Sequence, residues 1–138
     1  PFLFSVVVPE GNYRVTVHHG DLAGVSDLTI KAETRRLMIE RAVTSHGEIQ
    51  AVSFLVNVRN RTLPPPPANA PGGDRVRLND REDGPRGLVP HWDDKLTLEF
   101  NGARPCVAAV EIERMDDAVT VFLAGDSTVT DQPGEPSA

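Results

Sequence analysis

Apolar and polar residues alternate along most of the chain, which is the period-two pattern of half-buried β-strands. This alternation predicts strands within residues 2–8, 13–17, 28–32, 52–58, 96–100, 108–112 and 119–123. Between the first two lies Pro9-Glu10-Gly11-Asn12, whose residue types are typical of a turn, so this region predicts a β-hairpin. Asn101-Gly102 predicts another turn before the strand over 108–112.

The segment from Glu33 to Val43 fits two patterns. Its Glu, Arg, Leu and Met residues favour a helix, whereas Leu37, Ile39 and Arg41 also fit a strand. Because the rest of the chain is rich in strands, we interpret this segment as a strand. About seven or eight short strands separated by turns predict an all-β fold, an antiparallel β-sandwich.

Four consecutive prolines, Pro64 to Pro67, interrupt the strand pattern. Proline donates no backbone hydrogen bond and restricts its predecessor, so residues 63–73 favour an extended polyproline II segment. This segment is either a linker between two domains or a long connection within one sandwich. We favour one sandwich, because halves of about 60 residues would each be marginally stable. Residues 79–94 predict a second long loop.

The composition is that of a globular protein with an acidic surface. The chain has 138 residues, of which 39% are hydrophobic, and a formal net charge of -6. Nucleic acids and anionic membranes attract positive proteins, and no apolar run approaches the roughly 20 residues of a membrane-spanning helix. We therefore expect neither nucleic acid nor a membrane as a partner.

Two further features concern cysteine content and processing. A single cysteine, Cys106, excludes an internal disulfide and a cysteine-based zinc site. The chain begins with Pro rather than Met, from which we expect a processed product or an excised piece of a longer protein.

One apolar stretch, residues 119–123, leads directly into Gly125-Asp126-Ser127. A serine supported by a buried strand, with backbone N–H groups nearby, is what a nucleophile and its oxyanion hole require. The tripeptide alone fits a polar turn at the end of a strand better than it fits a nucleophile.

The longer string Phe122-Leu123-Ala124-Gly125-Asp126-Ser127-Thr128-Val129 resembles the first conserved block of the SGNH (GDSL-type) hydrolases, in the form found in rhamnogalacturonan acetylesterases. The resemblance implies that Ser127 is the catalytic nucleophile and that Asp126 orders its loop. It also implies the reaction, which is hydrolysis of acetyl esters on pectic sugars through an acyl-serine intermediate.

The strands upstream are similar to galactose-binding-like jelly-roll modules, which precede the esterase domain in some bacterial members of that family. Residues 4–17 resemble the opening hairpin of such a module, and residues 96–113 resemble its closing strands. The resemblance implies an accessory β-sandwich over residues 1–117. Residues 118–138 would then be the start of a truncated hydrolase domain, with its first strand, nucleophile block and tail. It also implies a secreted or periplasmic protein.

The resemblance covers only part of an active site. The family needs a glycine and an asparagine from later blocks and an Asp-x-x-His motif, whereas only eleven residues follow Ser127 and none is histidine. A serine without a base is not activated, so we expect an accessory module, inactive on its own, that binds carbohydrate. The alternatives are an acetyl-ester hydrolase that uses Ser127, and a structural spacer that packs against the missing catalytic domain.

Trp92, the single tryptophan, stands beside Asp93 and Asp94 at the end of the second long loop. An indole stacks on a pyranose ring and carboxylates accept hydrogen bonds from hydroxyls, so these residues predict a carbohydrate site. The alternative is that Trp92 anchors the loop to the core. Arg36 is a candidate contact for an anionic sugar such as galacturonate. The predicted partner is therefore a pectic oligosaccharide or polysaccharide.

Acidic residues cluster at 80–83, 93–94 and 116–117, and related modules sometimes hold a structural calcium ion. The first cluster does not fit an EF-hand, and Arg81 within it would oppose a cation. We interpret these clusters as solvated loop charge and predict no cofactor and no metal site. The adjacent His18 and His19 lie on a predicted strand, so they point to opposite faces and cannot easily bind one metal.

The apolar strand predicted at residues 121–123 has no neighbouring strands to cover it in this chain. An exposed apolar edge strand is a template for pairing with another chain. This strand therefore predicts self-association through the C-terminal edge.

Overall fold

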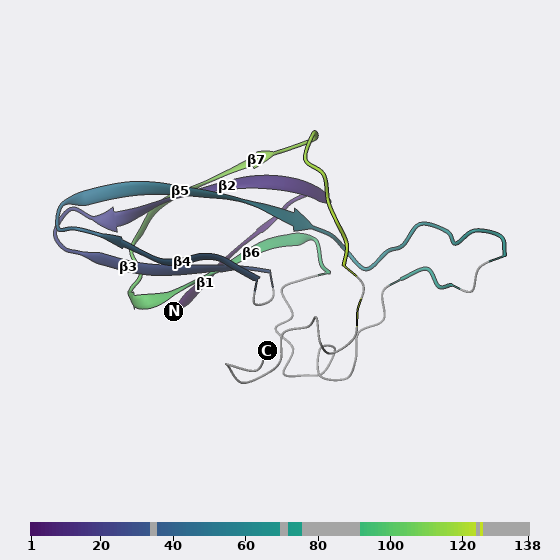
Figure 1. Cartoon of the computed structure of the whole chain (residues 1–138), viewed down its shortest axis with the longest axis horizontal. Coiled ribbons are helices and arrows are strands. Elements are labelled where there is room, and N and C mark those ends of the chain that lie inside the picture. The colour runs from purple at the N-terminus through teal and green to yellow at the C-terminus, as the bar shows by residue number, and fades with distance from the viewer. Residues whose placement is uncertain (34–35, 70–71, 76–91, 124, 126–138) are drawn as a thin grey trace.

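The computed structural model describes residues 1–33, 36–69, 72–75, 92–123 and 125. Over these residues the chain is all-β, and seven strands form two antiparallel sheets that face each other as a sandwich (Figure 1). This confirms the predicted antiparallel β-sandwich. In the same part of the chain, no helix is long and apolar enough to cross a membrane.

One sheet has the strand order β1-β6-β3-β4 and the other has the order β5-β2-β7. The strands are β1 (Phe2–Val7), β2 (Gly11–Asp21), β3 (Ser26–Ala32), β4 (Arg36–Thr44), β5 (Glu48–Val58), β6 (Lys95–Arg104) and β7 (Val107–Arg114). The presence of β4 confirms the interpretation of the ambiguous segment as a strand.

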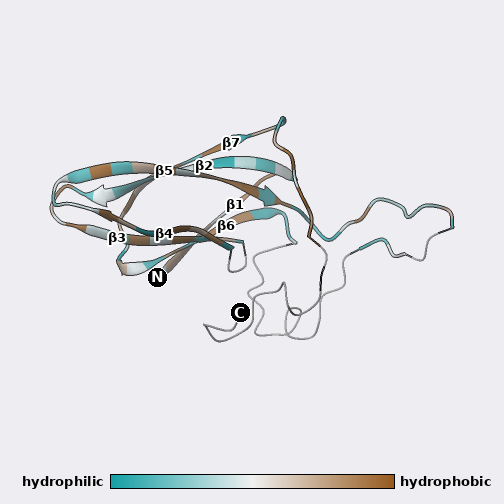
Figure 2. Ribbon diagram, viewed as in Figure 1, coloured by the Kyte–Doolittle hydropathy of each residue, from teal (hydrophilic) through white to brown (hydrophobic). Residues whose placement is uncertain are grey.

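The hydrophobic core lies between the two sheets and takes alternate residues from the long strands. In β2, Tyr13, Val15 and Val17 are buried, whereas Arg14 between them is exposed. Figure 2 shows the same alternation as hydrophobic and hydrophilic bands along β5. The other buried hydrophobic residues are Leu28, Ile30 and Ala32 of β3, Val56 and Val58 of β5, and Leu96, Leu98 and Phe100 of β6.

The predicted hairpin between the first two strands is wrong. Strand β1 pairs with β6, from Phe2 opposite Phe100 to Val7 opposite Lys95, whereas β2 lies in the other sheet. Residues 8–10, between β1 and β2, therefore carry the chain from one sheet to the other. Turn residues favour a change of direction without specifying the strands that they join, and the pairing with β6 decides this case.

The predicted turn at Asn101-Gly102 is also wrong, because both residues lie inside β6. Gly102 has a φ of 118°, and a Cβ atom there would lie 2.2 Å from the carbonyl oxygen of Asp27 on β3. The glycine therefore permits a close approach of two paired strands, where any other residue would clash. The chain leaves this sheet only after Arg104.

The proline-rich segment belongs to the connection between β5 and β6 and extends away from the sandwich (Figure 1). Each sheet contains strands from before and from after this connection, since β6 pairs with β1 and β3 while β7 pairs with β2. The base of the extension is closed where the N–H of Leu63 donates to the carbonyl of Asp74 at 3.0 Å. The segment is thus a connection within one sandwich and not a linker.

The predicted strand over residues 119–123 is not formed, because the structure assigns no strand to residues 115–123, which we call the C-terminal arm. The arm begins against the sandwich, where the N–H of Met115 donates to the carbonyl of Asn12 at 2.8 Å. The apolar side chains near its end are exposed, including Val121 (76%) and Leu123 (89%). The prediction of self-association through a strand edge therefore lacks its strand, although an exposed apolar surface is present.

Candidate functional site

The predicted catalytic residues Asp126 and Ser127 lie outside the described residues. Two of the four predicted carbohydrate-binding residues, Arg36 and Trp92, come together in one pocket of about 90 Å³. This pocket, which we call the Trp92 pocket, lies where β5 ends and β4 and β6 begin. Its lining residues are Glu33, Arg36, Asn57, Arg59, Trp92 and Phe122.

Trp92 lies between the end of β5 and the start of β6. Its backbone forms a parallel bridge with Asn60, two residues after β5, and it lies three residues before β6. Its φ of 61° lies in the left-handed region, which a bulky residue adopts only at an energetic cost. The backbone of Trp92 therefore closes the long connection against Asn60, and its half-buried side chain lines the pocket.

Glu33 is the buried acid of the Trp92 pocket, with 5% of its surface exposed. Its N–H donates to the carbonyl of Thr97 at 2.8 Å, and its Oε1 accepts from the N–H of Thr97 at 3.1 Å. Burial raises the pKa of Glu33 to about 7, although the Thr97 N–H and the positive charge of Arg36 act in the opposite direction. The nearby charge of Asp93 adds to the increase in pKa.

Backbone strain concentrates at this pocket. Among the described residues, three that are not glycine have a positive φ, and two of them, Glu33 (56°) and Trp92, line the pocket. Strained backbone conformations persist where the surrounding structure enforces them, and they cluster at binding and catalytic sites.

Asn57 positions both arginines of the pocket. Nη1 of Arg36 donates to the backbone carbonyl of Asn57 at 3.2 Å, and Nε of Arg59 donates to Oδ1 of Asn57 at 3.0 Å. The Arg59 guanidinium also lies over the ring of Phe122, with Cζ 4.6 Å from the ring centroid. Each guanidinium has five N–H donors, so both retain donors for a ligand.

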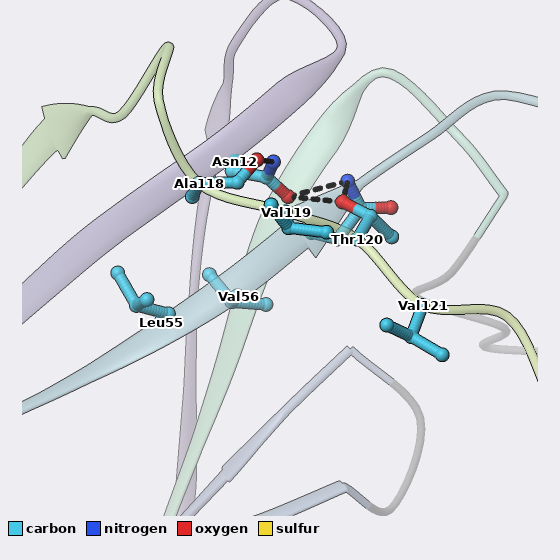
Figure 3. A pocket seen from close by; sticks show the side chains of 8 residues that line it. Asn12, Leu55, Val56, Ala118, Val119, Thr120 and Val121 are labelled. Atoms are coloured by element: carbon cyan, nitrogen blue, oxygen red, sulfur yellow. Dashed lines mark hydrogen bonds between the residues drawn. The ribbon is translucent and has the colours of Figure 1, made fainter.

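A second pocket, of about 200 Å³, shares Asn57 with the first and lies along the C-terminal arm (Figure 3). Its polar groups bond to one another: Thr120 Oγ1 donates to Asn12 Oδ1 at 2.8 Å, and Asn57 Nδ2 donates to the same Asn12 oxygen at 2.8 Å. These bonds hold the arm against the sandwich, so we assign this pocket a structural role. By holding the arm they also position Phe122 in the Trp92 pocket.

Thr120→Val removes the hydroxyl that bonds to Asn12 while it preserves the shape of the side chain. We expect the free energy of unfolding in urea to fall by about 1 kcal/mol, which is the usual net contribution of a hydrogen bond. The control is Thr16→Val, because the Thr16 hydroxyl bonds to Ser53 on an exposed face and should contribute less. Equal stability of Thr120→Val and the wild type would show that this bond does not hold the arm.

The two predicted aspartates do not line the pocket. Oδ1 of Asp93 accepts from the N–H of Lys95 at 2.9 Å, at the start of β6. Asp94 is exposed, and its carbonyl accepts from the N–H of Val8 at 3.1 Å. Within the described ranges, no three His, Cys, Asp or Glu side chains gather closely enough to hold a metal ion, while the acidic cluster at 80–83 lies outside them.

The adjacent histidines point to opposite faces of β2, as predicted. Nε2 of His18 lies 2.5 Å from Oε1 of Glu111 on the exposed face, whereas His19 is completely buried. Neither ring nitrogen of His19 has a hydrogen-bond partner among the described residues. Burial lowers the pKa of His19, against the opposing charge of Glu48. His19 is thus part of the core and does not share a site with His18.

Sequence reasoning missed four residues of the pocket: Glu33, Asn57, Arg59 and Phe122. Each carries a side chain that is common on protein surfaces or in cores, and no motif connects them. Comparison with protein-family models, with curated proteins and with solved structures finds no match for this chain. The geometry of the Trp92 pocket is therefore the observation from which we infer a function.

Proposed function

We propose that this chain is a carbohydrate-binding β-sandwich module and that the Trp92 pocket is its binding site. One observation carries the proposal: the pocket combines an indole on a strained backbone with a buried carboxyl group and two guanidinium groups held by Asn57. Carbohydrate sites typically combine an aromatic face with a few fixed polar groups.

The size of the pocket limits how a sugar enters it. A volume of about 90 Å³ is well below the roughly 300–1,000 Å³ of typical small-molecule pockets. The pocket therefore admits one substituent or one edge of a sugar ring, and the rest of an oligosaccharide lies over the neighbouring surface. This arrangement suits a module that binds a long chain at one point.

We further propose that the module is part of an exported pectin or rhamnogalacturonan acetylesterase. The resemblance of residues 122–129 to the nucleophile block of the SGNH hydrolases supports this part. In this context the ligand is a pectic oligosaccharide or polysaccharide, and the module holds the esterase near its substrate. Phe122 then belongs both to the string that resembles the family and to the wall of the pocket.

A structural spacer is the second candidate, and the exposed C-terminal arm favours it. Val119, Val121 and Leu123 are between 76% and 89% exposed, and contiguous apolar surface usually marks a site of interaction. In this function the arm packs against the catalytic domain that the resemblance implies, and the sandwich binds no sugar.

Fluorescence titration with pectic oligosaccharides separates the two candidates. The emission reports on the pocket because Trp92 is the only tryptophan. We expect a saturable shift that is weakened about tenfold or more by Arg59→Ala. Arg14→Ala is the matched control, since Arg14 pairs with Glu113 on an exposed face at 3.1 Å. No saturable change up to millimolar oligosaccharide would overturn the binding function and favour the spacer.

A further inference from the structure

The charges around the Trp92 pocket restrict the class of ligand that it can take. The lining residues carry two positive charges, on Arg36 and Arg59, and one carboxyl group, that of Glu33. When this carboxyl group is neutral the pocket attracts an anion, and when it is ionised it cancels one of the two positive charges. The protonation state of Glu33 therefore controls how strongly an anionic ligand is bound.

We propose that the pocket holds its ligand by a carboxylate that pairs with Arg36 and Arg59, and that Glu33 joins the complex as the neutral acid, so that binding takes up a proton. This inference rests on the proposed function, because it names the class of sugar, a uronate, and the regulation of the same site.

The two guanidinium groups are held in position before a carboxylate binds. Arg36 and Arg59 are anchored on the carbonyl and the side-chain oxygen of the same residue, Asn57, which limits their movement. Hydrogen bonds between guanidinium and carboxylate groups are charge-assisted and stronger than those between neutral groups. A neutral sugar would leave at least one of the two positive charges without a counterpart.

Glu33 is prepared to act as a hydrogen-bond donor. Its Oε1 is already bonded to the N–H of Thr97, so Oε2 is the oxygen that carries the proton in the neutral form. A protonated carboxyl group can donate this proton to a carboxylate, whereas an ionised one would repel it. With 5% of its surface exposed, Glu33 has little water to solvate a negative charge.

The charged groups around Glu33 in the described part of the chain come from three places in the fold. They are Arg36 at the start of β4, Arg59 just after β5, and Asp93 just before β6. A bound carboxylate adds a further negative charge, which raises the pKa of Glu33 above its value of about 7 in the free protein. By thermodynamic linkage, the anionic ligand must then bind more tightly at low pH.

Calorimetric titration with trigalacturonic acid and with its methyl ester tests the proposal. The acid is ionised at both pH 5.5 and pH 8, so a change in its affinity over this range comes from the protein. We expect the wild type to bind the acid about tenfold more tightly at pH 5.5 than at pH 8 and to show no such change for the ester. Near pH 7, the measured heat should depend on the ionisation enthalpy of the buffer, because protons are taken up.

Variants assign the effect to the named residues. Glu33→Gln should remove the pH dependence and still bind the acid, whereas Glu40→Gln, an exposed substitution on β4, should behave as the wild type. Arg36→Ala should reduce the preference for the acid over the ester by about tenfold. Equal binding of acid and ester at both pH values would overturn this inference and leave the carbohydrate-binding function in place. Binding of neither ligand would overturn both.

Discussion

Glu33→Gln is expected to raise the free energy of unfolding at pH 8 by about 3 kcal/mol and to change it much less at pH 5. The pKa of Glu33 is about 7 in the folded chain and 4.5 in the unfolded chain. Between these two pH values the native state therefore binds more protons than the unfolded state. The contribution of Glu33 to the stability of the wild type is therefore fully present below pH 4.5 and is lost as the pH rises toward 7. Glutamine is never charged, so this loss disappears.

Urea denaturation of both proteins from pH 4.5 to pH 8.5 measures this difference directly. The lowered pKa of His19 gives the opposite slope, because a buried neutral imidazole makes stability fall as pH drops below 6.5. Since this contribution is common to both proteins, it cancels when their curves are subtracted. The exposed Glu40→Gln is the control and should leave the curve unchanged. A difference between Glu33→Gln and the wild type that does not vary with pH would contradict the buried position of Glu33.

Leu98→Ala is expected to lower the free energy of unfolding by about 3 kcal/mol. Leu98 lies in β6 with no exposed surface, so the substitution leaves a cavity between the two sheets. Leu55→Ala removes the same atoms from a residue of β5 that is 52% exposed, and we expect it to cost less than about 1 kcal/mol. Chemical denaturation at fixed pH measures both values.

The comparison of these two leucines tests how the sheets face each other. Both residues lie in strands in which buried and exposed side chains alternate. Only the packing of one sheet on the other determines that Leu98 is buried and Leu55 is exposed. Equal losses of stability for the two variants would show that the faces of β5 and β6 are not placed as the sandwich requires.

The strands could largely be predicted from the sequence because their alternation is a local property. Val15 and Val17 follow polar neighbours with period two, and this period appears whichever strands lie beside them. Residues 119–123 are an exception, because they show the same alternation but form no strand. A strand needs a partner for its backbone groups, and the pattern of side chains does not supply one.

The pairing of the strands could not be predicted, because it depends on contacts between distant parts of the chain. Turn residues at 9–12 gave no sign that β1 would pair with β6, near the other end of the fold. The residue types of Asn101-Gly102 predict a turn, whereas the close approach of Asp27 explains the glycine. In both cases the decisive neighbour is far away in the sequence.

The candidate site was predicted only in part for the same reason. Trp92 and Arg36 have side chains whose chemistry suggests a sugar contact, and the structure places them in one pocket. Glu33 looks like an ordinary surface acid in the sequence, and only its contacts with Thr97 explain its burial. Asn57 acts through its position at the end of β5, where it reaches both arginines.

The most direct test of the Trp92 pocket as a carboxylate-binding sugar site is a ¹⁵N–¹H NMR titration with trigalacturonic acid at pH 5.5. For a ligand bound in this pocket, we expect the largest shifts at the Trp92 indole and at the amides of Glu33, Arg36, Asn57 and Thr97, and we expect them to saturate with one common dissociation constant. Shifts confined to the opposite end of the sandwich, around Ser26 and Gly47, or no saturable shifts at millimolar ligand, would contradict it.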